Sequence, residues 1–254
     1  MKNGIWYHKI LRRLMISNKK FAVFDVDGTL IRWQLYHAIV NRLAVKGFLG
    51  KESSKELKTA RMKWKVREND DSFKDYEKML VDLWTKNIHR VNYQDYLNTV
   101  TEITNEYLEQ TYTYTRNLIE DLKEDGYFLL AVSGSPIESI ELIAKRYGFD
   151  DFVTAKFDRD ESGKFTGHFS SPIHDKAKHL KILVEKHNLT WKDSVAVGDT
   201  SSDIAMLELV EKPIAFNPEK NLAHVAKDNG WQIVVERKNV IYKLQPDKGG
   251  WKVN

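Results

Sequence analysis

The 254-residue sequence contains no cysteine, which excludes disulfide bonds, a catalytic thiol and zinc sites built from thiolates. Long hydrophobic runs are also missing, since no apolar stretch approaches the length of a membrane span. The first segment lacks the continuous apolar region and small-residue cleavage site of a signal peptide. A cytoplasmic protein without a membrane span is therefore expected. Its length suffices for one large domain or two unequal domains with a substantial core.

Acidic residues are absent from residues 1–20, which contain six of the 40 lysines and arginines. The rest of the chain carries 34 basic and 36 acidic residues, so this basic extension accounts for the net charge of +4. We therefore expect no nucleic-acid binding by the body of the protein. The extension could form an amphipathic helix that contacts a membrane surface, RNA or the protein itself. A packed or frayed terminus is the favoured interpretation.

Glycine is missing between Gly50 and Gly126, and all five prolines lie at or after Pro136. Within this stretch, apolar residues recur at helical spacing. We therefore predict an all-helical insertion of about four helices over residues 32–112. Three apolar stripes support it: Leu35, Ile39 and Leu43; Phe73, Tyr76, Leu80, Leu83 and Trp84; and Tyr93, Tyr96, Leu97, Val100, Ile103 and Tyr107.

The remaining sequence alternates short apolar strands with single helices. Such alternation implies right-handed crossovers and a doubly wound, mostly parallel α/β sheet. Strands are predicted at 21–24, 127–132, 151–157, 194–197, 213–216 and 232–235, and a β-hairpin at 158–170. Helices are predicted at 117–124, 136–147, 176–188, 203–210 and 222–229. The expected domains are the basic extension 1–20, an α/β core formed by 21–31 and 113–254, and a helical cap over 32–112.

Two carboxylates follow the first predicted strand. Asp25 and Asp27 precede Gly28 and Thr29, a turn signal. Alternate side chains of an extended strand share a face, so both carboxylates would point the same way. Crowded like charges are unfavourable without a cation or a shared proton. An ordinary Asp-Gly turn would require only one of them, which leaves Asp25 unexplained.

Polar residues also follow the second predicted strand. The segment Ser133-Gly134-Ser135-Pro136 precedes a predicted helix, whose free backbone N–H groups could bind an anion. Ser135 could simply cap that helix, which leaves Ser133 available to the anion.

Asp199 and Asp203 follow the fourth predicted strand, and Lys176 opens a predicted helix. Asp203 could be an ordinary charge at a helix N-terminus, but Asp199 could share a cation with Asp25. Mg²⁺ prefers such hard oxygen ligands. A lysine in the first helical turn opposes the helix dipole, and beside several carboxylates it would offset their charge.

These four segments, in order, resemble the four motifs of the haloacid dehalogenase superfamily: Asp25-Val26-Asp27-Gly28-Thr29, Ser133, Lys176 and Gly198-Asp199 with Asp203. The resemblance spans roughly residues 21–235. A helical insertion directly after the first motif, together with Ser133-Gly134-Ser135, is similar to the phosphoserine-phosphatase-like branch.

The resemblance implies a Mg²⁺-dependent phosphatase that forms a phospho-aspartate. Asp25 would be the nucleophile, while Asp27 would protonate the leaving alcohol and then activate water. Mg²⁺ would be bound by Asp25, the Asp27 carbonyl and Asp199, with Asp203 in support. The phosphoryl oxygens would be held by Ser133, the Gly134 N–H and Lys176.

The cap is expected to select the substrate, a small phosphorylated metabolite. Phosphoserine phosphatases carry a glutamate nine residues after the nucleophile, where this chain has Gln34. Arg61 and Arg67 could present cations to an acidic substrate, or they could belong to a solvated helix face with Trp64 in the core. Phosphoserine, histidinol phosphate and phosphocholine all stay open. A phosphotransferase or mutase using the same covalent step, and a non-catalytic phosphate-binding module, are the alternatives.

Overall fold

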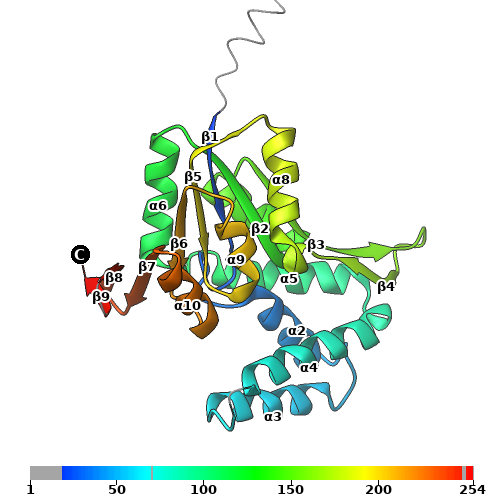
Figure 1. The fold of residues 1–254 in the computed structure, drawn as a ribbon. Coiled ribbons are helices and arrows are strands. Elements are labelled where there is room, and N and C mark those ends of the chain that lie inside the picture. The colour runs from blue at the N-terminus through cyan, green and yellow to red at the C-terminus, as the bar shows by residue number, and fades with distance from the viewer. Residues whose placement is uncertain (1–18, 70, 248–249, 254) are drawn as a thin grey trace, which may run out of the picture.

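The computed structural model describes residues 19–69, 71–247 and 250–253, which form one nine-stranded sheet with helices on both faces (Figure 1). Its order is β4-β3-β2-β1-β5-β6-β7-β8-β9. The six central strands, β3, β2, β1, β5, β6 and β7, pair in parallel. β4 is antiparallel at one edge, and β8 and β9 are antiparallel at the other. The strands are β1 (Lys20–Phe24), β2 (Phe128–Pro136), β3 (Asp151–Arg159), β4 (Phe165–Ser170), β5 (Thr190–Gly198), β6 (Lys212–Phe216), β7 (Gln232–Arg237), β8 (Val240–Asp247) and β9 (Gly250–Val253). The predicted fold class is confirmed.

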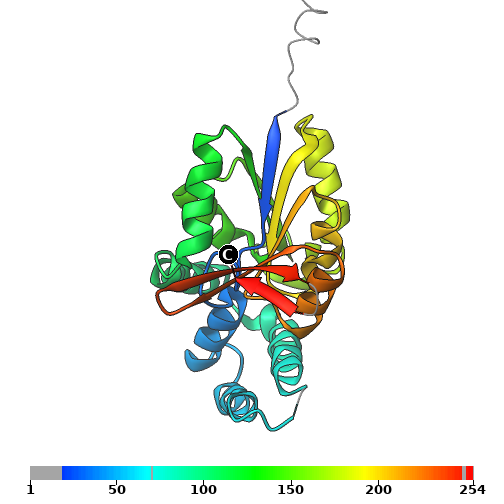
Figure 2. The same ribbon diagram turned by 60° about the vertical axis from the view of Figure 1, so that its left-hand side comes forward.

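Helices cover both faces of the parallel strands, as Figure 2 shows. They are α6 (Thr113–Glu124), α7 (Ile137–Tyr147), α8 (Lys176–Lys186), α9 (Ile204–Leu207) and α10 (Lys220–Asp228). In β1, Ala22 and Phe24 pack into the core on the α6–α7 face, and Phe21 and Val23 into the core on the α8–α10 face. A strand buried on both faces reads as a continuous apolar run because both of its alternating faces need apolar side chains.

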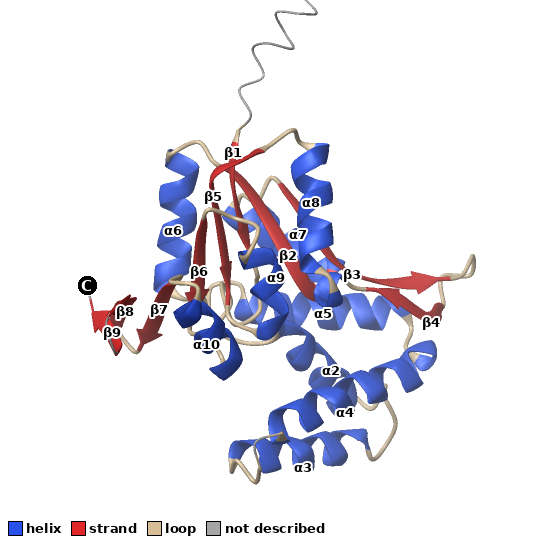
Figure 3. Cartoon of the chain, in the orientation of Figure 1, coloured by secondary structure: helices blue, strands red, loops and turns tan. Residues whose placement is uncertain are grey.

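The insertion after β1 is helical and lies at the carboxyl ends of the parallel strands (Figures 1 and 3). It contains α2 (Leu35–Val45), α3 (Ser53–Lys65), α4 (Ser72–Asn87), the short 3₁₀ helix η1 (Ile88–Arg90) and α5 (Tyr93–Tyr107). The outgoing and returning segments run side by side, because the Arg32 N–H donates to the Gln110 carbonyl at 2.8 Å and the Tyr112 N–H to the Leu30 carbonyl at 3.0 Å. The cap is therefore connected to the core through a narrow two-stranded base.

Three local features differ from the sequence prediction. β8 and β9 extend the sheet beyond residue 235, where no strand was predicted. The β7–β8 turn carries no glycine or proline signal and uses Lys238 with φ of 55° instead. The helix predicted at 203–210 is only α9, preceded by a 3₁₀ turn at Ser201–Asp203. Finally, Pro136 ends β2 and α7 begins one residue later than predicted.

Residues 1–18, most of the predicted basic extension, lie outside the described residues. Among the described helices, none has the length and hydropathy that crossing a membrane would require.

Candidate active site

Carboxylates from distant parts of the chain meet where the central strands end. β1 lies between β2 and β5, with Phe24 opposite both Ala131 and Val197. The loops that follow these strands are therefore neighbours. Oxygens of Asp25, Asp199 and Asp203 all lie within 4.8 Å of one another. The structure thus brings together the carboxylates that the sequence analysis selected from two separate motifs.

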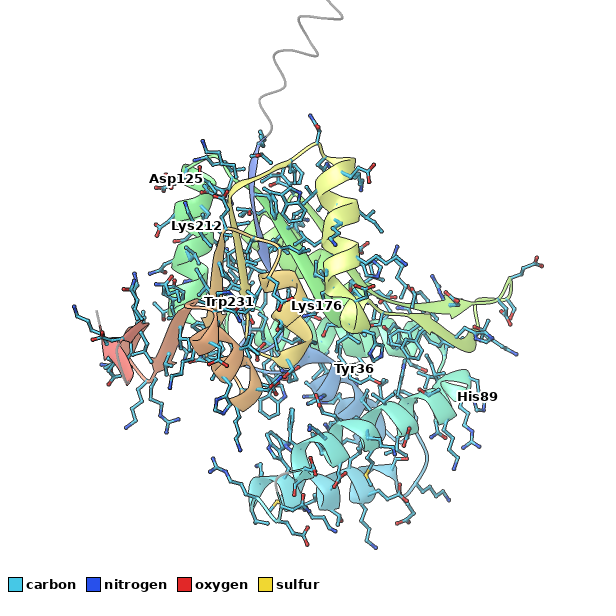
Figure 4. The ribbon with its side chains drawn as sticks, viewed as in Figure 1. Tyr36, His89, Asp125, Lys176, Lys212 and Trp231 are labelled. Atoms are coloured by element: carbon cyan, nitrogen blue, oxygen red, sulfur yellow. The ribbon has the colours of Figure 1, made fainter. Side chains whose placement is uncertain are left out.

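Lys176 joins the motif loops in the interior of the core (Figure 4). Its Nζ donates to Asp25 Oδ1 at 2.7 Å and to Asp203 Oδ1 at 2.6 Å, and the residue is only 3% exposed. Asp175 caps α8 by accepting from the Lys178 N–H, which places Lys176 in the first turn. Burial lowers the pKa of Lys176, but the two carboxylates outweigh it and hold that pKa above its usual range. The unfavourable helix position is thus offset by local ion pairs.

Negative charge exceeds positive charge at this site. Burial raises the pKa of Asp25 to about 7; Lys176 opposes the rise, and Asp203 and Asp27 add to it. Burial, together with Asp25 and Asp203, also holds the pKa of Asp199 well above its usual range. A raised carboxyl pKa means that the ionised form lacks sufficient compensation. A cation beside these carboxylates would supply it.

Asp27 is bonded differently from Asp25. Its Oδ1 accepts from the Leu35 N–H at 2.6 Å, and its Oδ2 accepts from Ser133 Oγ at 2.9 Å. β1 ends at Phe24, so the chain is no longer extended, and the two carboxylates reach different partners. The Asp27 side chain is thereby oriented by the first turn of α2 and by the carboxyl-terminal part of β2.

Two glycines leave room for the carboxylates of Asp199 and Asp203. Gly28 has φ of 82°, and a Cβ at this position would overlap Asp199 Oδ2. A Cβ at Gly198 would lie 2.5 Å from the Asp203 Cβ. Thr29 Oγ1 donates to Asp199 Oδ1 at 3.1 Å from the same loop as Gly28. Larger residues at either glycine would push the carboxylates apart.

Asp203 orients the loop that carries Asp199. Its fully buried carboxylate accepts from the Asp199 N–H at 3.1 Å and from the Thr200 N–H at 3.0 Å. Thr200 Oγ1 also donates to Asp203. Asp203 therefore binds both the loop and Lys176, and one of its carboxylate oxygens also belongs to the acidic cluster.

The segment Ser133–Pro136 forms the end of β2, which continues through Pro136. Ser133 is fully buried, and its Oγ accepts from the Ser135 N–H at 3.0 Å while donating to Asp27. Gly134 is partly exposed. Ser135 does not cap α7: Pro136 occupies the N-cap, and Ser135 Oγ is buried without a hydrogen-bond partner among the described residues.

The proposed specificity residues lie at different distances from the site. Gln34 is the N-cap of α2, and its Nε2 lies 3.5 Å from the Asp27 carbonyl oxygen. The Arg61 guanidinium lies 5.2 Å from the ring centre of Trp33, the residue before Gln34. Arg67 is exposed beyond the end of α3, and none of the interactions found within the described residues joins it to the site. Trp64 stacks on Tyr76 with ring centres 5.7 Å apart, which agrees with the interpretation of Trp64 as a core residue.

Sequence reasoning missed the Leu35 N–H as a partner of Asp27. A backbone donor has no side-chain signature, although the first N–H groups of any helix are free. The start of α2 shortly after the Asp-x-Asp motif was the signal that could have revealed it. Sequence reasoning also missed Thr200, whose role depends on loop geometry.

The core, the helical cap and the buried acidic cluster together define a capped α/β enzyme. Residues 22–208 match the haloacid dehalogenase-like hydrolase family, and the chain belongs to this family. It is 21% identical to a histidinol-phosphatase of Neisseria meningitidis over 85% of this chain and 98% of that protein. It is 26% identical to a phosphoserine phosphatase of Methanocaldococcus jannaschii, over 80% of this chain and 87% of that protein. A phosphoserine phosphatase of Archaeoglobus fulgidus is 28% identical over 82% of this chain, which spans only 55% of that protein.

Solved structures share the fold. A protein of unknown function from Bordetella pertussis Tohama I superposes with a TM-score of 0.67 at 18% identity, over 85% of this chain and 98% of that one. A phospho-aspartyl intermediate analogue of phosphoserine phosphatase gives a TM-score of 0.60 at 20% identity, over 87% and 95%. The predicted superfamily, its phosphoserine-phosphatase-like branch and the predicted enzyme class, a hydrolase, are confirmed.

Proposed function

We propose that the chain is a Mg²⁺-dependent phosphatase that hydrolyses a small phosphomonoester through a phospho-aspartate at Asp25. Its family and relatives identify it as a hydrolase of phosphoric monoesters. The observation that carries the finer proposal is the separation of the two motif carboxylates. Asp25 lies among Lys176, Asp199 and Asp203, while Asp27 is held apart by hydrogen bonds. The cytoplasmic location expected from the sequence stays a prediction.

The donor set fits Mg²⁺. Asp25, the Asp27 carbonyl and Asp199 would hold the ion, and Asp203 would orient the loop of Asp199. All are hard oxygen donors, which Mg²⁺ prefers. The raised pKa values of Asp25 and Asp199 support this proposal, because a cation would compensate the ionised carboxylates. When bound, the ion would neutralise charge on the transferring phosphoryl group and keep Asp25 ionised.

Asp25 and Asp27 have different roles in the two chemical steps. Asp25 attacks phosphorus, the bond to the leaving oxygen breaks, and Asp27 gives that oxygen its proton. Water then attacks the phosphorus of the phospho-aspartate and gives a proton to Asp27. The bond between phosphorus and Asp25 breaks, so the Asp25 carboxylate is restored and inorganic phosphate is released. Ser133 Oγ, the Gly134 N–H and Lys176 would hold the phosphoryl oxygens. Such positioned donors supply most of the stabilisation in phosphoryl transfer.

Removal of divalent cations is expected to abolish the release of p-nitrophenol from p-nitrophenyl phosphate, and added Mg²⁺ should restore it. Asp199→Asn should raise the Mg²⁺ concentration needed for half-maximal rate by about tenfold or more, because the site loses one charged ligand. Asp193→Asn is the matched control, since Asp193 forms surface ion pairs with Lys20 and Lys212. Full activity in a chelator would contradict the metal requirement.

An acidic leaving group is the substrate class that the cap favours. Arg61 has a buried Nε without a hydrogen-bond partner and no ion pair within the described part of the chain. It lies against the ring of Trp33, and the backbone of Trp33 is bonded to the motif loop, because its carbonyl accepts from the Gly28 N–H at 3.3 Å. A half-buried, unpaired guanidinium is costly unless a ligand pairs with it. We propose that a carboxylate of the leaving group does so.

Arg61→Met should lower kcat/KM for phosphoserine about tenfold or more relative to p-nitrophenyl phosphate, which has no carboxylate. The loss should appear mainly in KM, because Arg61 would contact the leaving group and not the reacting atoms. Arg67→Met is the control and should leave the ratio of the two substrates as in the wild type. An unchanged ratio in Arg61→Met would refute this substrate class.

A further inference from the structure

One buried carboxylate of the core holds both segments that connect the core to the cap. Glu236 lies in β7, and its side chain is only 3% exposed. Its Oε1 accepts from Arg32 Nη2 at 2.6 Å and from the Thr113 N–H at 3.1 Å, while its Oε2 accepts from the Tyr114 N–H at 2.8 Å. Arg32 belongs to the outgoing segment, and the two amides belong to the first turn of α6, where the returning segment ends.

Arg32 of the outgoing segment also contacts the returning segment directly. Its Nε donates to the Thr111 carbonyl at 2.7 Å, and its guanidinium lies 5.2 Å from the ring centre of Tyr112. We call Arg32, Thr111, Tyr112 and Glu236 the cap clamp. The guanidinium thus makes three interactions at once: an ion pair, a hydrogen bond to the backbone and a contact with an aromatic ring. The Arg32 side chain is 42% exposed and the Glu236 side chain 3%, so the ion pair links an exposed residue of the outgoing segment to a buried carboxylate of β7.

The outgoing segment joins the cap clamp to Asp27. On one side its backbone is bonded to the motif loop, since the Gly28 N–H donates to the Ile31 carbonyl at 3.0 Å. On the other side Arg32 is bonded to Glu236. Leu35, three residues after Arg32, donates its N–H to Asp27 Oδ1 at 2.6 Å. The position of this donor therefore depends on where the cap clamp holds the start of α2.

We propose that Arg32 and Glu236 are positioning residues that keep the Leu35 N–H against Asp27, so that Asp27 can protonate the leaving alcohol. The inference rests on the proposed function, in which Asp27 is the general acid. Neither residue touches the substrate. The cap clamp acts through the start of α2. Its loss should therefore slow the hydrolysis of a substrate more when the leaving group of that substrate needs a proton from Asp27.

The test compares glycerol 2-phosphate, whose alkoxide needs protonation, with p-nitrophenyl phosphate, whose phenolate leaves without it. Because kcat/KM reports on steps up to the first irreversible one, it includes leaving-group departure. In Arg32→Met, the ratio of kcat/KM for the alkyl ester to that for the aryl ester should fall about tenfold, a part of the 10²–10⁴-fold typical of general acid catalysis. Arg32→Lys should restore part of the ratio, since an ammonium can pair with Glu236 but lacks the second donor for Thr111.

Arg42→Met is the matched control. Arg42 pairs with Glu102 and Glu106 entirely within the cap, so its loss should leave the ratio unchanged. If Arg32→Met folds poorly, Glu236→Gln provides the second variant, because it removes the charge that pairs with Arg32 while its single amide oxygen can still accept from one of the two α6 amides; the ratio should fall here too. Equal loss on both esters, or no loss, would overturn the positioning role while leaving the phosphatase intact. A wild type without Mg²⁺-dependent activity would overturn the proposed function itself.

Discussion

Asp25→Asn is expected to abolish metal-dependent phosphatase activity, with a loss of about 10⁴-fold or more, as removal of a covalent nucleophile typically does. An amide lacks the anionic oxygen that attacks phosphorus. The substitution is isosteric, and Lys176 retains Asp203 as an ion-pair partner at 2.6 Å. The fold should therefore persist. The measurement is p-nitrophenol release with Mg²⁺ present, together with a search for acid-stable radiolabel on the protein.

The same variant should also change the pH dependence of stability. The folded state binds a proton at Asp25 more tightly than the unfolded chain, because burial raises the pKa from 3.8 to about 7. Ionisation therefore costs stability as the pH rises from about 4 to 7, and asparagine removes this cost. In a chelator, the melting temperature of Asp25→Asn relative to wild type should be higher at pH 8 than at pH 5.

Phosphatase activity of Asp25→Asn near the wild-type rate would show that Asp25 is not the nucleophile.

The sequence was sufficient to predict the parallel strands of the sheet and the four motifs. Phe21 to Phe24 form a continuous apolar run because β1 is buried on both faces, and that pattern is local. Each motif follows directly on a predicted strand or opens a predicted helix. In a parallel sheet the carboxyl ends of strands meet at one edge, so the proximity of Asp25 and Asp199 follows from their place after strands.

Contacts between distant polar groups could not be predicted in this way. Arg32 and Glu236 are separated by 204 positions, and each reads as an ordinary charged residue in its own segment. Their pairing depends on the place of β7 in the sheet and on the path of the outgoing segment. Arg67 was proposed to present a cation to the substrate; it lies exposed beyond α3, and that role stays a prediction.

The β3–β4 hairpin is an element that the sequence predicts, although its packing against the cap is not predictable from the sequence. Turn residues at 160–163 made the hairpin predictable. Its contact with the cap was not, since it depends on aromatic side chains from three segments. Phe165 lies 5.1 Å from Tyr96 and 6.1 Å from Trp84, measured between ring centres. This cluster fixes the α4–α5 end of the cap to the core, and the cap clamp fixes its base.

Asp27→Asn is expected to separate the two chemical steps. The amide oxygen can still accept from the Leu35 N–H, and the amide NH₂ can donate to Ser133 Oγ, because a hydroxyl can rotate to accept. The geometry around Asp25 should therefore persist, while proton transfer is lost. With p-nitrophenyl phosphate the first step needs little protonation, so the phospho-enzyme should form. Its hydrolysis needs a base and should be slower by about 10²–10⁴-fold.

Rapid-mixing kinetics of Asp27→Asn should then show a burst of p-nitrophenol approaching one equivalent per chain, followed by slow turnover. Phosphate bound to the quenched protein should match the size of the burst. Asp25→Asn combined with Asp27→Asn is the control and should show neither, because the attacking oxygen is gone. Steady turnover at the wild-type rate without a burst would mean that another group transfers the proton. The hydrogen bonds of Asp27 to Leu35 and Ser133 would then serve only to hold the start of the cap against the end of β2.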